Sequence, residues 1–372
     1  MSRGIRISKI IAINLLVLVL LLVVAEGLSS YFFFTYGVFN RRPIAERVHT
    51  EYDEELGWVN LPNLNIQDMY GPGIGFRTNS QRYRNATDFA PDVPAGKIRL
   101  VCSGDSFTLG YGVDNDNTWC QLLTSLDERL ETVNMGQGGY GIDQSYLAYE
   151  RNKNALKHDV HVFAFITDDF HRMERERFLG YGRPHLILRN GRLLPRDTPV
   201  PRTWYYYPWL TTNVRALREL KSVEFIFASV GFMKRLASPV SRGIASSSSA
   251  GSAPVQEHTA AIASAIFADL QRASQEGGSL LVLVYLPTLD DFMTEAATAR
   301  WVAFVRDEAK QHGYLFVDLV EELQKVRPDS VRGLFTRGAL PHYSREGNRY
   351  VAETLYRRLR AMPEMEKLLK TR

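Results

Sequence analysis

The sequence predicts a three-layer α/β domain, with a parallel sheet of five strands covered by helices on both faces, behind a membrane-spanning N-terminal helix. Three observations predict this architecture. Short continuous apolar runs alternate with stretches of helical periodicity from residue 97 to the C-terminus. Turns containing Gly or Asp follow the apolar runs. A single long apolar block precedes all of this, close to the N-terminus.

The composition is that of an ordinary globular chain. Of 372 residues, 45% are hydrophobic and 23% are charged, which excludes disordered, collagen-like and disulfide-dense proteins. The mean hydropathy of −0.20 excludes several membrane spans. The net charge of +4 gives no indication of a nucleic-acid partner. Two cysteines, Cys102 and Cys120, are too few for a disulfide framework or a four-ligand zinc site, and the sequence leaves open whether they pair.

The apolar block at residues 10–34 is long enough to cross a membrane, which takes about 20 residues. Residues 1–9 carry three basic side chains and no acid, which predicts a cytoplasmic N-terminus and an extracytoplasmic body. We interpret residues 10–34 as an uncleaved anchor. The alternatives are a secretory signal cleaved near Ala25 and a buried soluble helix. Residues 35–96 are rich in Pro, Gly and Asn, which predicts a juxtamembrane extension of loops and short strands without its own core.

Residues 97–372 contain the predicted sheet. The five strands are expected at residues 98–102, 132–134, 160–166, 280–286 and 314–318. Helices are expected at about 117–130, 142–156, 256–276 and 294–312, with a last one beginning near Ser344.

Residues 172–254 do not follow this alternation, and we interpret them as an insertion. They contain a hairpin signal at Asn190-Gly191, an aromatic cluster at 204–209 and a Ser-rich run at 245–252. Ligands bind outside the carboxyl ends of parallel strands, where this insertion begins, so a lid or substrate wall is expected. The aromatic cluster either packs the insertion or stacks on sugar rings.

Polar residues that can carry chemistry follow the strands. Ser106 stands in a Gly104-Asp105-Ser106 turn after the first strand, and Asn134 to Gly139 form a Gly-rich turn after the second. Thr167, Asp168 and Asp169 follow the third strand, and His342 precedes the last helix. A serine nucleophile needs a base such as histidine, whereas the alternative is an Asp-Ser turn that satisfies its own backbone. The histidines at 158, 161, 171 and 185 show no metal-ligand spacing.

These four segments, in this order, resemble the SGNH (GDSL) hydrolase family, which are serine esterases and acyl hydrolases on a flavodoxin-like sheet. Gly104-Asp105-Ser106 is similar to the first family block, with Phe107 where many members have leucine. Residues 134–139, residues 167–169 and His342 are similar to the second, third and last blocks. Upstream, residues 56–58, 79–80 and 84 resemble the lead-in of membrane-anchored bacterial members.

The resemblance implies ester chemistry without a metal or organic cofactor. Ser106 is the implied nucleophile and His342 the implied base. The implied oxyanion hole comprises the N–H groups of Ser106 and Gly139 together with the position of Asp168. Asp105, Thr167 and Asp169 are accessory candidates.

The chain departs from the family pattern at two places. The acid that usually precedes the histidine is replaced by Ala339 and Leu340. Three alternatives therefore stay open: a backbone carbonyl orients His342, an acid arrives from elsewhere, or catalysis is weak. Asp168 stands where the family has an asparagine donor. It donates only if burial beside Asp169 raises its pKa, or else Thr167 donates in its place.

The sequence thus predicts a serine ester hydrolase anchored in the bacterial inner membrane, with its catalytic domain in the periplasm. The expected substrates are O-acyl, especially O-acetyl, esters on envelope or exported glycans, and envelope polysaccharide machinery is an expected partner. One alternative is an O-acyltransferase that uses the same serine. The other is a catalytically lapsed domain that binds glycan or acts as a scaffold.

Overall fold

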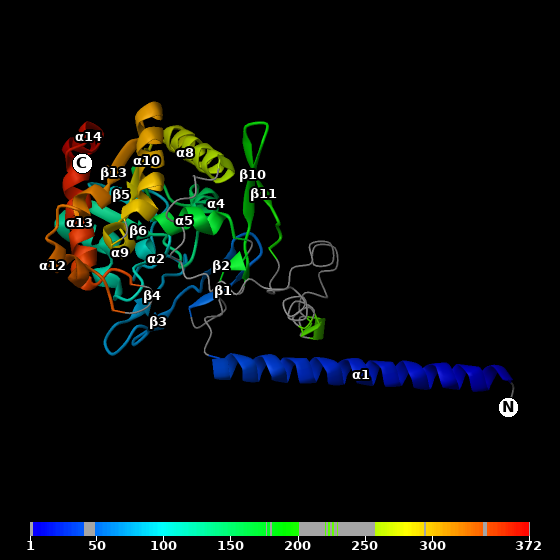
Figure 1. Ribbon diagram of the computed structural model, residues 1–372. Helices are drawn as coiled ribbons and strands as arrows, with labels where there is room; N and C mark the ends of the chain where they lie inside the picture. The colour runs from blue at the N-terminus through cyan, green and yellow to red at the C-terminus, as the bar shows by residue number, and fades with distance from the viewer. Residues whose placement is uncertain are drawn as a thin grey trace.

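Five parallel strands form the central sheet of the protein, in the spatial order β13-β12-β7-β5-β6 (Figure 1). The computed structural model describes residues 3–40, 49–175, 177–178, 181–200, 220, 222–223, 225–226, 229, 257–293, 295–337 and 341–371. The strands are β5 (Ile98–Ser103), β6 (Leu130–Asn134), β7 (Val160–Phe165), β12 (Leu280–Tyr285) and β13 (Leu315–Asp318). Of these five strands, the second along the chain, β6, lies at one edge of the sheet beside the first, β5, which is the flavodoxin-like arrangement. The predicted parallel five-stranded sheet is confirmed.

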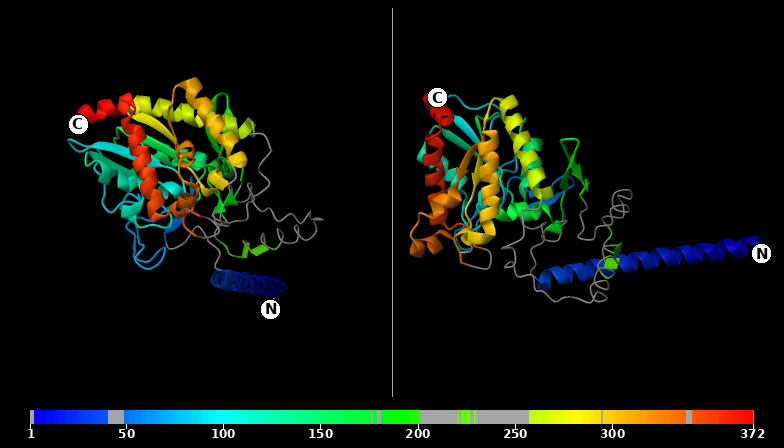
Figure 2. Two further views of the ribbon diagram at one scale, coloured as in Figure 1. Left: turned by 60° about the vertical axis from the view of Figure 1, so that its left-hand side comes forward. Right: turned by 45° about the horizontal axis from the view of Figure 1, so that its top comes forward.

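Helices cover both faces of the sheet, because successive strand residues point to opposite sides and both sides are apolar. On one face Leu100 packs in a buried cluster with Trp119 and Leu355. On the other face Val101 packs in a second cluster with Phe267 and Trp301. The first cluster is built on α3 (Trp119–Leu126) and α13 (Arg345–Arg360), and the second on α4 (Ile142–Asn152), α8 (Glu257–Gly277) and α10 (Glu295–His312) (Figure 2).

Shorter elements connect these layers. They are α2 (Ser106–Leu109), η1 (Asn115–Asn117), α5 (Thr167–Met173), α9 (Leu289–Met293), α11 (Leu319–Leu323), α12 (Pro328–Val331) and η3 (Arg332–Leu334). A separate last helix, α14 (Pro363–Thr371), follows α13, whereas the sequence predicted a single final helix. Proline lacks an N–H and clashes with the preceding turn, so Pro363 begins a new helix rather than continuing α13.

Helix α1 (Arg3–Asn40) extends away from the body of the protein (Figures 1 and 2). Its apolar stretch Ile7–Phe32 reaches a mean hydropathy of 2.8, and the most apolar 18 residues of the stretch include no buried residue. By length and composition this stretch qualifies as a membrane anchor or a signal sequence. Within this stretch, the Glu26 carboxylate accepts hydrogen bonds from the N–H and the hydroxyl of Ser222, at 2.9 and 2.6 Å.

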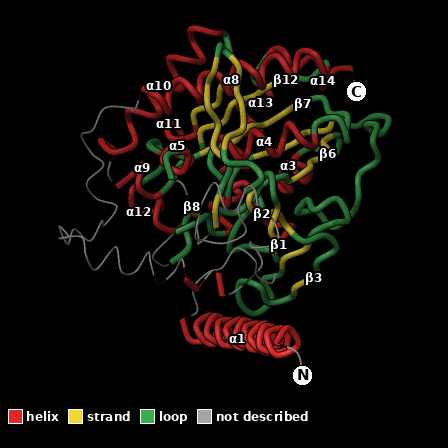
Figure 3. Tube along the Cα trace, turned by 90° about the vertical axis from the view of Figure 1, so that its right-hand side faces the viewer, coloured by secondary structure: helices red, strands yellow, loops and turns green. Residues whose placement is uncertain are grey.

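The segment at 49–96 precedes the sheet, and its first strands, β1, β2 and β3, lie between the sheet and α1 (Figure 3). It contains two antiparallel pairs, β1 (Thr50–Asp53) with β2 (Gly57–Asn60), and β3 (Asn65–Ile66) with β4 (Phe76–Arg77). Trp58 is buried against Tyr140, which lies beyond the end of β6. The part of the segment around β2 therefore packs at the carboxyl edge of the sheet.

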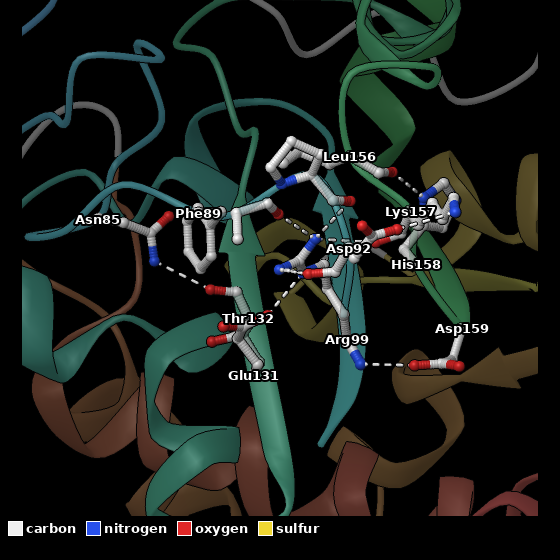
Figure 4. Close-up of polar contacts among 12 residues, drawn as sticks. Asn85, Phe89, Asp92, Arg99, Glu131, Thr132, Leu156, Lys157, His158 and Asp159 are labelled. Atoms are coloured by element: carbon white, nitrogen blue, oxygen red, sulfur yellow. Dashed lines mark hydrogen bonds and ion pairs between the residues drawn. The ribbon is translucent and has the colours of Figure 1, made fainter. Parts of the chain in front are cut away.

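A buried arginine at the start of β5 fastens the end of this segment to the sheet (Figure 4). Arg99 donates to the carbonyl oxygens of Ala90 and Lys157, at 2.8 and 3.0 Å, and forms an ion pair with Glu131. Its own backbone N–H donates to Asp159 at 2.9 Å. These contacts join residues from before β5, from β6 and from before β7 at one guanidinium.

The predicted hairpin is confirmed within residues 172–254. Strand β10 (His185–Arg189) pairs with β11 (Arg192–Arg196), and Asn190 and Gly191 both have positive φ, 51° and 72°. A second small pair joins β8 (Arg177–Phe178) to β9 (Tyr181–Gly182). The aromatic cluster at 204–209, the Ser-rich run at 245–252 and the residues Ala339 and Leu340 lie outside the described residues.

Candidate active site

Ser106 is the first residue of α2, directly beyond the carboxyl end of β5. The turn needs glycine at position 104, because a Cβ there would lie 2.4 Å from the carbonyl oxygen of Ala164. Asp105 caps the helix by accepting a hydrogen bond from the N–H of Phe107 at 2.8 Å. This geometry fixes the Ser106 side chain at the edge of the sheet.

His342 lies beside Ser106 although 236 residues separate them in the sequence. Its Nε2 atom is 2.9 Å from Ser106 Oγ, a hydrogen-bond distance. The His342 N–H donates to Thr336 Oγ1 at 3.0 Å, and its carbonyl accepts from the Thr336 N–H at 2.7 Å. The two sequence-predicted residues therefore have the spacing that a nucleophile and its base require.

The turn after β6 lies against the same helix. Asn134 accepts a hydrogen bond from the Gly136 N–H and donates to the Thr108 carbonyl, both at 3.0 Å. Gly139 has φ +81°, and a Cβ there would lie 2.3 Å from the ring of Phe178. Among the described residues, neither the Ser106 N–H nor the Gly139 N–H donates a hydrogen bond. Neither N–H group therefore has a protein acceptor among these residues.

The three residues after β7 have different environments. Thr167 Oγ1 lies 2.7 Å from the hydroxyl of Tyr285, and the Thr167 side chain is buried. Asp168 is exposed, whereas Asp169 is buried and accepts from the Ile166 N–H at 3.1 Å. The burial that one alternative requires of Asp168 is thus found at its neighbour, because these residues lie in the first turn of α5 and point in different directions. Within the described part of the chain, neither Thr167 nor Asp168 makes a hydrogen bond with Ser106.

Arg172 joins three of these loops, a contact that the sequence analysis missed. Its Nη1 atom donates to Asp105 Oδ2 at 2.9 Å, to Asp169 Oδ1 at 2.5 Å and to the Tyr140 carbonyl at 2.9 Å. Asp105 Oδ2 also lies 3.4 Å from Ser106 Oγ. The spacing of Asp169 and Arg172, three residues apart on one helix, is the only signal of this cluster in the sequence.

Charges in this cluster interact strongly because the side chains are buried. Burial, and then the nearby carboxylate of Asp105, raise the pKa of Asp169 well above its usual value, against the lowering effect of Arg172. Two carboxylates that share one guanidinium favour a proton on one of them.

A second serine–histidine pair lies inside the sheet. Ser103 Oγ is 2.6 Å from His161 Nε2, and both side chains are almost completely buried. Tyr149 stacks on the His161 ring at 3.6 Å. Burial lowers the pKa of His161 well below its usual value, so its imidazole is neutral.

Cys102 and Cys120 are both buried and carry free thiols.

No family model and no curated protein matches the sequence. Similar solved structures include a member of the lipolytic protein G-D-S-L family from Veillonella parvula, at 12% identity and TM-score 0.39, covering 70% of this chain and 97% of that one. Another is a G-D-S-L family protein from Desulfitobacterium hafniense, described as putative, at 15% identity and TM-score 0.39, covering 70% of this chain and 99% of that one. A third is a variant of an acetylxylan esterase from Geobacillus stearothermophilus, at 14% identity and TM-score 0.38, covering 72% of this chain and 95% of that one. Similarity at this level leaves the activity to be inferred from the site.

Proposed function

We propose that the protein is a serine ester hydrolase that removes O-acyl groups, O-acetyl groups in particular, from envelope or exported glycans. The observation that carries the proposal is the 2.9 Å contact between Ser106 Oγ and His342 Nε2 at the carboxyl edge of the sheet. A hydroxyl paired with an imidazole at this distance is an activated nucleophile.

In the proposed reaction, Ser106 Oγ attacks the ester carbonyl carbon while its proton passes to His342 Nε2. The tetrahedral intermediate collapses, the bond to the alcohol oxygen breaks, and His342 returns the proton to that oxygen. Water then attacks the acyl-serine, giving its proton to His342. Free carboxylic acid leaves, and the proton on His342 returns to Ser106.

The oxyanion of each intermediate is assigned to the N–H groups of Ser106 and Gly139. The absence of another acceptor for these two groups among the described residues supports the assignment. An ionised carboxylate only accepts hydrogen bonds, so Asp168 is assigned to the rim of the site rather than to the oxyanion.

The proposed location is the bacterial inner membrane, with residues 10–34 as the anchor and residues 97–372 as the periplasmic catalytic domain. The apolar stretch Ile7–Phe32 and the basic residues before it support this topology. A periplasmic enzyme of this kind is expected to work beside envelope polysaccharide machinery.

The test uses the full chain in detergent with two substrates, 4-nitrophenyl acetate and an O-acetylated oligosaccharide, and measures release of nitrophenolate and acetate. We expect Ser106→Ala and His342→Ala each to abolish turnover, and Ser106→Ala to abolish labelling by a fluorophosphonate. Ser125→Ala, on the exposed side of α3, is the matched control and retains both. A wild-type protein that matches Ser106→Ala in turnover and labelling would overturn the proposal. Acetate that moves to an added unacetylated oligosaccharide rather than to water would identify the transferase instead.

A further inference from the structure

Two aromatic rings pack against the imidazole of His342. The Phe107 ring is stacked on it, with centroids 4.7 Å apart and planes at 28°. The Tyr111 ring lies 4.8 Å away with planes at 39°. We call Phe107 and Tyr111 the aromatic clamp.

Phe107 is held firmly by its surroundings. Its side chain is only 6% exposed, and its ring meets Tyr343 edge-on at 4.9 Å. Its carbonyl accepts a hydrogen bond from Trp119 Nε1 at 3.0 Å, and its N–H is bound by Asp105. The residue that follows the nucleophile therefore has a fixed ring to present to the base.

Tyr111 is placed by the segment that precedes the sheet. The Tyr70 ring meets Tyr111 at 4.7 Å, and the buried guanidinium of Arg84 lies over the Tyr70 ring at 5.7 Å. Arg84 also donates to the carbonyl oxygens of Leu109 and Gly110, at 2.7 and 2.5 Å, directly before Tyr111. The position of Tyr111 is thus set from outside its own loop.

We propose that the aromatic clamp positions His342 and stabilises the imidazolium that forms when Ser106 gives up its proton. This inference rests on the proposed function. An aromatic face attracts a cation whose centre lies within about 6 Å of the ring, and both clamp rings lie within that distance. Contact with two rings also limits rotation of the imidazole, which keeps Nε2 directed at Ser106 Oγ. Phe107 and Tyr111 are positioning residues, because they act through His342.

A comparison of esters with different leaving groups distinguishes this role of the aromatic clamp from a merely structural one. An alkoxide, such as a sugar oxygen, leaves only with the proton that His342 delivers, whereas 4-nitrophenolate leaves without it. A misplaced or destabilised imidazolium therefore slows acylation by a sugar acetate more than acylation by an aryl acetate. Because kcat/KM covers the steps up to acylation, the ratio of kcat/KM for the two esters reports the clamp.

The experiment compares the full chain in detergent with Phe107→Leu, Tyr111→Leu and Tyr111→Phe, using methyl 6-O-acetylglucoside and 4-nitrophenyl acetate. Each leucine variant is expected to lose about tenfold in kcat/KM for the sugar ester and about threefold or less for the aryl ester. Tyr111→Phe keeps the ring and is expected to retain the wild-type ratio. Thermal unfolding of each variant is measured alongside.

Leucine variants with the wild-type ratio of kcat/KM would overturn the clamp while leaving the ester hydrolase in place. If Phe107→Leu does not fold, Tyr111→Leu still decides the matter, because Tyr111 is 45% exposed and its ring is not part of the core. Equal activity of wild type and Ser106→Ala overturns the proposed function itself, which is a different outcome of the same assays.

Discussion

Arg172 and Asp105 form a buried ion pair, with Arg172 Nη1 2.9 Å from Asp105 Oδ2, next to Ser106. The same nitrogen binds Asp169 and the carbonyl of Tyr140. The loops after β5, β6 and β7 therefore meet at one guanidinium. Because the Asp105 carboxylate also lies 3.4 Å from Ser106 Oγ, the positive charge of Arg172 offsets the negative charge beside this hydroxyl.

Replacing Arg172 with methionine is expected to destabilise the fold by about 3–5 kcal/mol, because it leaves two buried carboxylates without their partner. Urea unfolding of the full chain, followed by circular dichroism, measures the change. Lys157→Gln is the control, since Lys157 and its partner Asp92 are 80% and 76% exposed, and no measurable change is expected there. Equal stability of the two variants would contradict the role given to Arg172.

The raised pKa of Asp169 predicts a stability that falls as the pH rises. The folded chain holds the Asp169 proton more tightly than the unfolded chain, whose carboxyl has a pKa near 3.8. The contribution of Asp169 to stability is therefore complete below pH 3.8 and decreases from there up to the raised pKa of the folded state.

Asp169→Asn removes this titration. The free energy of unfolding of the wild type minus that of Asp169→Asn is expected to decrease with pH above about 4, by at most about 1.4 kcal/mol per pH unit. Urea titrations at several pH values measure the difference. A difference that is flat or rises over this range would show that the pKa is not raised.

Gly139→Ala is expected to lower kcat/KM at least about tenfold and to destabilise the protein by about 1–3 kcal/mol. The new Cβ would meet the Phe178 ring at 2.3 Å and force the backbone away from φ +81°. Gly191→Ala is the matched control, because Gly191 has φ +72° with no atom within 4 Å of its Cβ. Gly191→Ala is expected to lower the free energy of unfolding by about 1 kcal/mol and to leave kcat/KM unchanged. Equal catalytic losses in both variants would argue against a specific role of Gly139.

The two serine–histidine pairs are expected to react differently with a fluorophosphonate. Ser103 is 1% exposed and His161 is completely buried, so the reagent has no access to that pair. Mass spectrometry of the labelled protein should find the adduct on Ser106, and Ser103→Ala should leave its stoichiometry unchanged. An adduct on Ser103 would contradict the burial of this pair.

The sheet could be predicted because buried parallel strands are written as continuous apolar runs, such as residues 160–166. Helix ends were less predictable. Helix α3 ends at Leu126 rather than near residue 130, because Asp127 adopts an extended conformation that the apolar spacing does not encode. Pro363 was a visible signal for the break before α14, and it was missed.

Ser106 and His342 could be predicted because each occupies a local turn at the end of an element. Arg172 and Arg84 could not, because their functions depend on which distant carbonyls and carboxylates the fold brings to them. The difference between Asp168 and Asp169 was equally hidden. Adjacent helical residues point about 100° apart, and only the packing of α5 decides which of them is buried.

The hydrogen bond from Trp58 Nε1 to the Gly138 carbonyl, at 2.8 Å, bears on how this chain can be shortened. Trp58, Tyr70 and Arg84 all precede the first strand of the sheet, yet they contact Gly138, Tyr111 and Leu109, which follow β6 and β5. The folded unit around the candidate site therefore begins before its sheet. A protease-released or engineered form that starts at residue 97 would lose these contacts, whereas one that starts before Thr50 keeps them.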